Sequence, residues 1–378
     1  MRYSVQPNEI AGFVALLDAA NFYSQEHGEK SKWLERFPEL KNTKFEELVD
    51  FIRDESQSSG KALPLRKLLQ VFLPEIRSVD DLKNYIRQSR NSNIDSVKIG
   101  EMIDSVYPVY QKFYQANEAK LKDTAKRATE LLDKIAIEPL KQVSHFFNPE
   151  YQPAEKITTV HMFPTAINGW RGQNFRTQKG DTPQEDQQWV ALGADLMNGT
   201  HPIDVGCISS TIYHEKVHGI FHDSGADKKL SDFLKSENKI VQMLTDFPEL
   251  KRNPNVRAVN EAEMMVNETL TSAFEGILNE DVRGKEKEIL YENHMINTMA
   301  HRMIPLLREA IKTGETFGPE FMKKFENEFI KAVPKMLESA HRNKVAKSLQ
   351  RTLFEASQKE KRALETHRIA EKIKKQNA

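Results

Sequence analysis

The apolar and polar positions in the first third of the chain repeat with the period of an α-helix. In FEELVDFIRDES (residues 45–56), the apolar side chains are spaced i, i+3, i+4 and i+7, at Phe45, Leu48, Val49 and Ile52. This spacing gathers them into one stripe along a helix. We therefore predict a surface helix that buries one face.

Helical patterning continues to about residue 148. Ser78 followed by Asp81 is typical of a capping box, which satisfies free backbone N–H groups at the start of a helix. Residues 109–145 consist mainly of strong helix formers. The sequence therefore predicts a helical N-terminal domain over residues 1–148.

The pattern changes in NPEYQPAEK (148–156), where two prolines among polar residues indicate a boundary. KITTVHMF (156–163) is rich in β-branched residues and alternates, as a strand does, and QWVALGADL (188–196) is a second strand candidate. Between them, the glycine-punctuated INGWRGQNF (167–175) is typical of a loop. We predict a small sheet in this part of the chain.

Helical patterning resumes at about residue 255 and continues to a charged tail. The predicted fold class is therefore mainly α (α+β). Its three regions are a helical domain over residues 1–148, a central region over 149–282 that holds the sheet, and a helical C-terminal region over 283–378.

The pentapeptide FPELK occurs twice, at residues 37–41 and 247–251. The residues around the two copies do not match. We interpret the pair as a coincidence and not as an internal repeat.

Charge and cysteine content exclude some classes of protein. The chain of 378 residues has 55 basic and 55 acidic residues, so charge indicates neither nucleic-acid nor membrane binding. The single cysteine, Cys207, excludes an intramolecular disulfide framework. No stretch approaches the ~18 apolar residues of a membrane span, and the N-terminus lacks the pattern of a conventional signal peptide. We expect a cytoplasmic protein, or one exported without such a signal.

The residues most indicative of chemistry lie in TIYHEKVHGIFHD (211–223). On a helix, His214 and His218 project from one face about one turn (~5.4 Å) apart, so both imidazoles can bind one cation. Glu215 projects about 100° away, where it can reach water without binding the metal. Zinc held by three protein ligands activates water, and a carboxylate can then accept the proton. We predict one zinc ion per chain, with Glu215 as the general base.

The flanks of this motif resemble the zinc helix of the zincin metallopeptidases. In that family uncharged and apolar residues bracket the HExxH histidines, as five residues do here: Thr211, Ile212, Val217, Gly219 and Ile220. Lys216 departs from the family pattern, because that position is usually uncharged. The resemblance implies a zinc-dependent peptidase, and it makes residues 149–282 the zincin-like region.

A zinc site needs a third ligand, and zincins supply it in two ways. Metzincins use a histidine in HExxHxxGxxH, but His222 comes too early and would lie about 12 Å along the helix axis from His214. Gluzincins use a glutamate from a later helix, and NETLTSAFE resembles the segment that carries it. We therefore predict Glu268 as the third ligand. Glu261, one heptad earlier on nearly the same face, is the alternative.

The resemblance also implies an edge strand and an oxyanion donor. In zincins an edge strand ahead of the zinc helix binds substrate by β-augmentation. QWVALGADL is in the right position for that strand, and equally for an ordinary core strand. A tyrosine or histidine downstream usually donates to the developing oxyanion. Residues 291–302 offer Tyr291, His294 and His301, of which we predict Tyr291 or His294; each also suits a packing role.

These features predict a zinc-dependent metallopeptidase acting on peptide or protein substrates, with the histidine pair and Glu268 on the metal and Glu215 as base. Two other classes fit the same sequence. One is a helical protein-interaction module on a zincin-like scaffold, without metal or with a structural zinc; the other is a metal-dependent hydrolase of a non-peptide amide. A structural zinc site would have a fourth protein ligand in place of water. His222 or Asp223 is the candidate for that ligand.

Overall fold

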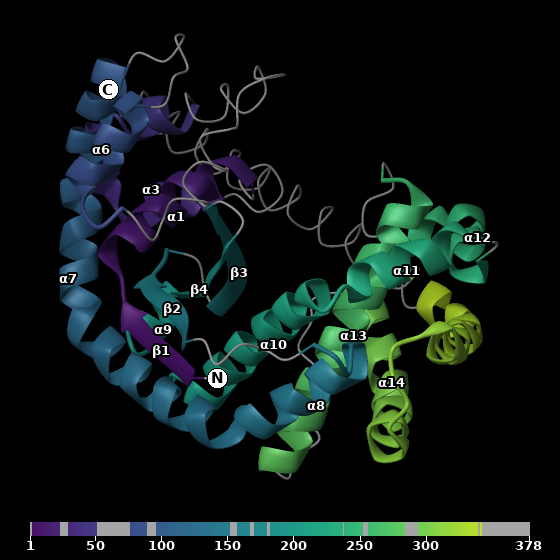
Figure 1. Ribbon diagram of the computed structural model, residues 1–378. Helices are drawn as coiled ribbons and strands as arrows, with labels where there is room; N and C mark the ends of the chain where they lie inside the picture. Colours follow the sequence, from purple (N-terminus) through teal and green to yellow (C-terminus); the bar gives the residue numbers. More distant parts are fainter. Residues whose placement is uncertain are drawn as a thin grey trace, which may run out of the picture. The chain divides into compact units, whose positions relative to one another are not determined.

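The computed structural model is mostly helical with one small sheet, which confirms the mainly α (α+β) fold class (Figure 1). It describes residues 2–22, 29–50, 76–88, 96–151, 157–166, 170–179, 182–236, 238–251, 256–283, 294–338 and 341. The chain forms two compact units: unit 1 is Met1–Ala226 with Ile277–Glu286, and unit 2 is Asp227–Gly276 with Lys287–Ala378. The three-region division stays a prediction. No described helix has both the length and the apolar character that crossing a bilayer requires.

Unit 1 holds the sheet and the helices around it. Its elements are β1 (Arg2–Pro7), α1 (Glu9–Phe22), α3 (Glu29–Arg36), the 3₁₀ helix η1 (Pro38–Asn42), α6 (Val79–Gln88), α7 (Ser96–Ile135), α8 (Ile137–Phe147), β2 (Ile157–Pro164), β3 (Trp170–Lys179), β4 (Thr182–Leu192), α9 (Ala194–Met197) and α10 (Val205–Asp223). Residues 45–50 are also helical, and Phe45, Leu48 and Val49 are buried there. The amphipathic helix is thus confirmed over its described part; Ile52 lies outside the described residues.

Ser78 and Asp81 begin α6 as their spacing predicts. The Asp81 N–H donates to Ser78 Oγ at 3.1 Å, and Asp81 Oδ2 accepts from the Arg77 N–H at 3.1 Å. These two hydrogen bonds satisfy backbone donors near the free end of the first turn.

The sheet has the order β1-β2-β4-β3, with β1, β2 and β4 parallel and β3 antiparallel to β4. The strand predicted at 156–163 is confirmed as β2. The second predicted strand is confirmed only to Leu192, because the chain then turns into α9. As β4 lies between β2 and β3, it is a core strand, and the edge alternative is wrong for it.

Two strands were not predicted from the sequence. β3 covers most of the stretch predicted as a loop, and β1 lies within the stretch predicted as a helical domain. Both owe their conformation to a partner: β3 pairs with β4 over nearly its whole length, and β1 pairs with β2, far along the chain. Strand propensity depends on such pairing more than on the local sequence.

Helices pack on both faces of this sheet. α1 lies on the face that carries Phe163, where a Cβ built on Gly12 would lie 2.7 Å from the Phe163 Cβ. α10 lies on the opposite face, where a Cβ built on Gly172 of β3 would lie 2.6 Å from Thr211 Cγ2. The two glycines therefore permit closer approach of helix and strand than any other residue would allow.

A partly buried hydrogen-bond chain links three segments of unit 1 on the α1 side. Asn8 Oδ1 accepts from the Ala11 N–H at 2.8 Å, capping α1, so its amide nitrogen donates to His161 Nδ1, also at 2.8 Å. His161 Nε2 then donates to Gln187 Oε1 at 2.6 Å. The imidazole is therefore neutral, with its proton on Nε2.

This arrangement predicts a pH-dependent component of stability. Burial lowers the pKa of His161 from its ordinary value, so the unfolded chain binds the proton more readily than the folded protein does. The free energy of unfolding should therefore fall as the pH drops below about 6.5. Denaturant unfolding between pH 8 and 5 measures this, and His161→Gln should flatten the curve relative to the wild type. Parallel curves for the two proteins would contradict the prediction.

Unit 2 consists of helices. Its elements are α11 (Ala226–Lys235), α12 (Lys239–Asp246), the 3₁₀ helix η2 (Pro248–Leu250), α13 (Ala258–Arg283), whose last turns from Ile277 belong to unit 1, α14 (His294–Thr313) and a further helix over 319–338. Met299 and Met303 of α14 are fully buried, as are Phe325 and Phe329 of the last helix. Arg302 and Glu328 join these two helices by an ion pair of 3.1 Å.

The two copies of FPELK adopt the same local structure. Phe37 (φ −122°, ψ 79°) and Phe247 (φ −124°, ψ 76°) each end a helix and precede a 3₁₀ turn that begins at the proline. The N–H of Leu40 and that of Leu250 donate to the carbonyl of the preceding phenylalanine, both at 3.0 Å, and both leucines are buried. Proline fixes the turn and leucine anchors it, so the pentapeptide determines its conformation locally.

Candidate metal centre

The HExxH residues lie on α10, as predicted. Asp204 begins this helix, its carboxylate accepting from the Cys207 N–H at 3.1 Å. The helix ends at Ser224, and Gly225 follows with a φ of 75°, a left-handed conformation that favours glycine. Most side chains of α10 are buried, including His214, which is 8% exposed. The motif therefore sits on a rigid, well-packed element.

The two imidazoles converge. His214 and His218 point their Nε2 atoms at one another at 3.1 Å, with ring centroids 4.8 Å apart and planes at 77°. This follows from their i, i+4 spacing, which places both side chains on one face of the helix. The Nε2 atoms of the two histidines are thus close enough to serve as ligands of one metal ion.

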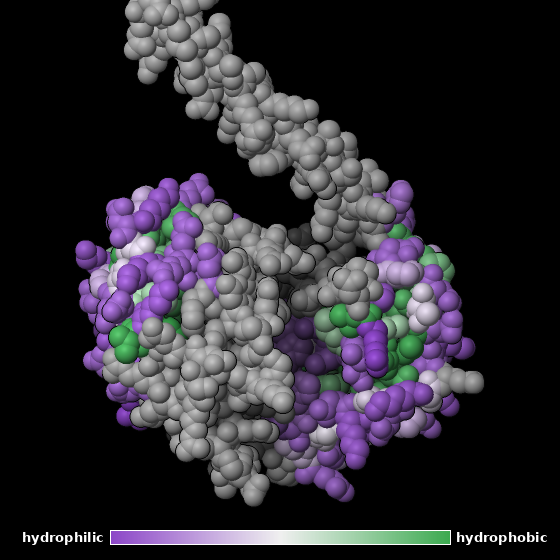
Figure 2. Space-filling view, turned by 90° about the horizontal axis from the view of Figure 1, so that it is seen from above, coloured by the Kyte–Doolittle hydropathy of each residue, from purple (hydrophilic) through white to green (hydrophobic). Residues whose placement is uncertain are grey.

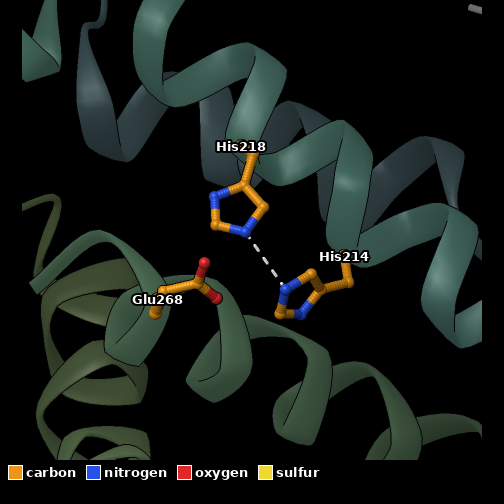
Figure 3. Close-up of side chains that lie close together, drawn as sticks. All are labelled: His214, His218 and Glu268. Carbon is orange, nitrogen blue, oxygen red and sulfur yellow. Dashed lines mark hydrogen bonds between the residues drawn. The ribbon is translucent and has the colours of Figure 1, made fainter. Parts of the chain in front are cut away.

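Glu268 of α13 joins the histidine pair. One ligand atom from each of His214, His218 and Glu268 lies within 4.8 Å of the others (Figure 3). Glu261, the alternative, is buried at 3% exposure and is not a member of this cluster. The structure thus brings together the three residues predicted as ligands, while their binding of a metal stays a prediction.

The cluster has donors that bind zinc, and the spacing of its histidine pair suits zinc. Histidine nitrogen and carboxylate oxygen are both zinc ligands, and two nitrogens on a tetrahedral zinc lie about 3.3 Å apart, close to the 3.1 Å between the two Nε2 atoms. Three protein ligands are the number found in catalytic sites, whereas structural sites use four. Across the described parts of the chain, no fourth His, Cys, Asp or Glu belongs to the cluster.

Glu215 lies beside β3. It is partly exposed, and a Cβ built on Gly172 would lie 3.2 Å from Glu215 Cγ and 3.6 Å from its Oε1. Thr211, one turn earlier, makes the still closer contact with this strand. Gly172 therefore leaves the space that the Glu215 side chain occupies. Gly172 was not singled out in the sequence because its segment was predicted as a loop. A glycine inside a strand often marks a close approach of another element, and that was the available signal.

A hydrogen bond ties the end of α13 to α10. Asn279 Nδ2 donates to Ser210 Oγ at 2.9 Å, and both side chains are buried. Ser210 precedes His214 by four residues, so it lies on the same face of α10 as the metal-ligand candidates. Neither residue was predicted; the i, i+4 spacing of Ser210 and His214 was the only signal.

The other predicted site residues lie outside the cluster or outside what the structure describes. Tyr291 is not among the described residues, and of His294 only the backbone is described, at the start of α14. The side chain of His301 is exposed. His222 and Asp223 are exposed at the end of α10 and are not members of the metal cluster. The oxyanion donor therefore stays a prediction.

Comparisons of the chain with protein-family models, with curated proteins and with solved structures gave no match. The functional interpretation therefore depends on the residues of the site and their geometry.

Proposed function

We propose that this protein is a zinc-dependent metallopeptidase of the zincin type, with a gluzincin-like ligand set. The observation that carries the proposal is the convergence of His214, His218 and Glu268 into one cluster, with Glu215 as the next residue after the first ligand. Each of the four has the residue type and relative position that hydrolysis by an HExxH site needs.

The residues of the chain divide the chemistry between them. Zinc, when bound, supplies a Lewis acid that activates water and polarises the substrate carbonyl. The histidine pair and Glu268 would hold the zinc, three protein ligands being the number typical of catalytic sites. Glu215 accepts the proton from the attacking water and then delivers it to the leaving amine, since the same carboxylate acts as base and acid in turn.

The sheet supports a peptide as the substrate. β3 is an edge strand that pairs only with β4 among the described strands, and it passes the Glu215 side chain at Gly172. An extended peptide that adds to this edge would have its backbone held by main-chain hydrogen bonds. The edge-strand role predicted for residues 188–196 is therefore assigned to β3 instead.

The zinc content of the purified protein, measured by elemental mass spectrometry without added metal, tests the proposal. We expect about one zinc per chain in the wild type and in His222→Ala, and loss of zinc in His218→Ala. His222 is the matched control because it lies on the same helix outside the cluster. Hydrolysis of a peptide mixture should stop with a chelator and return with zinc. A wild type that neither contains nor takes up metal would overturn the proposal.

Enlarging Gly172 should impair hydrolysis and spare metal binding. In Gly172→Ala the new methyl group would lie 2.6 Å from Thr211 Cγ2 and 3.2 Å from Glu215 Cγ, so Thr211 must shift and Glu215 must give by a few tenths of an ångström. A misplacement of ~1 Å costs up to about 100-fold, so this smaller displacement should lower kcat by up to about tenfold at unchanged zinc content. Adding Thr211→Ser removes the nearest methyl group and should restore part of the rate. Unchanged kinetics in Gly172→Ala would contradict this reading of β3.

A further inference from the structure

Gln188 of β4 has no solvent exposure, yet it carries a polar amide. A buried amide without hydrogen bonds is costly. In the orientation that satisfies both its groups, the amide of Gln188 donates to the Ile212 carbonyl and accepts from the Lys216 N–H, each at 3.2 Å. Both partners are backbone atoms of α10, so a side chain of the sheet holds the helix by its main chain.

The Ile212 carbonyl and the Lys216 N–H are also the acceptor and the donor of one i→i−4 hydrogen-bond position along the helix. The turn they enclose contains Tyr213, His214 and Glu215. The amide is therefore hydrogen-bonded to the helical turn that carries His214, the first metal-ligand candidate, and Glu215, the general-base candidate. We call Gln188 with its two hydrogen bonds the Gln188 clasp.

The clasp acts on the side of α10 that faces away from the metal cluster. At 100° per residue, Ile212 and Lys216 project nearly opposite to the face of His214 and His218, and Glu215 projects between these two faces. On the Glu215 side of the helix, the absence of a side chain at Gly172 leaves room for α10 to pack closely against β3. The clasp and Gly172 together fix how far α10 can turn about its own axis.

We propose that Gln188 is a positioning residue, which fixes the rotation of α10 and thereby the directions of His214 and Glu215. It does so without touching metal or substrate. This inference rests on the proposed function, because the direction of these side chains matters only if they bind zinc and activate water.

The test compares Gln188→Met with Gln187→Met. Methionine keeps the length of the side chain and removes its hydrogen bonds. Gln187 is the matched control: it is the neighbouring residue of β4, it is buried, and it bonds His161 and not α10. Zinc affinity by chelator competition and the visible absorption of the cobalt(II)-substituted protein report the ligand geometry. Hydrogen exchange of the Lys216 N–H in metal-free protein reports the clasp itself.

In Gln188→Met we expect zinc affinity to fall about tenfold, as for other groups that orient ligands, with an altered cobalt spectrum and faster Lys216 exchange. Gln187→Met should lose stability while these three quantities stay as in the wild type. If Gln188→Met does not fold, Gln188→Asn withdraws the amide by one methylene group and should shift all three in the same direction.

Wild-type affinity, spectrum and exchange in a folded Gln188→Met or Gln188→Asn would overturn the inference, as would equal effects of Gln187→Met. Failure of the proposed function is a different result: a wild type that binds neither zinc nor cobalt. In that case hydrogen exchange would still decide whether Gln188 holds the helix.

Discussion

Glu215→Gln is expected to abolish peptide hydrolysis while the protein keeps its zinc. Glutamine has the shape of glutamate and cannot accept the proton from water, and general base catalysis contributes about 10²- to 10⁴-fold. Zinc should remain because the cluster of His214, His218 and Glu268 does not include Glu215. The ratio kcat/KM for a cleaved peptide and the zinc content of the same preparation measure the two effects.

Asp223→Asn is the matched control for this substitution. It also removes one carboxylate from α10, but at an exposed position outside the metal cluster, so both zinc content and rate should stay at the wild-type level. Undiminished hydrolysis by a zinc-loaded Glu215→Gln protein would show that another group takes the proton.

Glu268→Ala is expected to weaken zinc binding by more than about 100-fold. Substitution of groups that only orient a ligand already costs 10- to 100-fold in metal affinity, and Glu268 is placed to bind the ion directly. The dissociation constant for zinc, measured by competition with a chromophoric chelator, checks this.

Glu261→Ala is the control that separates the two candidate glutamates. Both lie on α13, one heptad apart, but only Glu268 is in the cluster. Glu261 is buried, so its loss should lower the free energy of unfolding and leave the zinc affinity of the folded protein unchanged. The opposite pattern, with zinc lost in Glu261→Ala and kept in Glu268→Ala, would make Glu261 the third ligand.

Several elements of this protein follow from nearby residues alone. The i, i+4 spacing of His214 and His218 is sufficient to bring two imidazoles together once a helix forms. The Ser78 cap and the two FPELK turns likewise form from contacts within a few residues. Such contacts have the same geometry wherever the segment occurs, which is why the Ser78 cap could be predicted from the sequence.

The sequence favoured Glu268 over Glu261 only through the resemblance of NETLTSAFE to a gluzincin segment. Glu261 and Glu268 share a helix and nearly the same face, and both follow an asparagine. Local spacing cannot separate two positions one heptad apart. In the folded chain, Glu268 is the glutamate that clusters with His214 and His218.

The sheet shows the same limit. β1 lies at the start of the region predicted as a helical domain and β3 largely in a segment predicted as a loop, and each becomes a strand by pairing with a partner strand. The sequence by itself therefore determined the helix that carries HExxH, its two histidines and the identity of the candidate base, and it favoured Glu268 as the third ligand candidate. The tertiary structure alone decided the edge strand and the contacts of Gly172 and Gln188 with α10, because each depends on residues that meet only after the chain has folded.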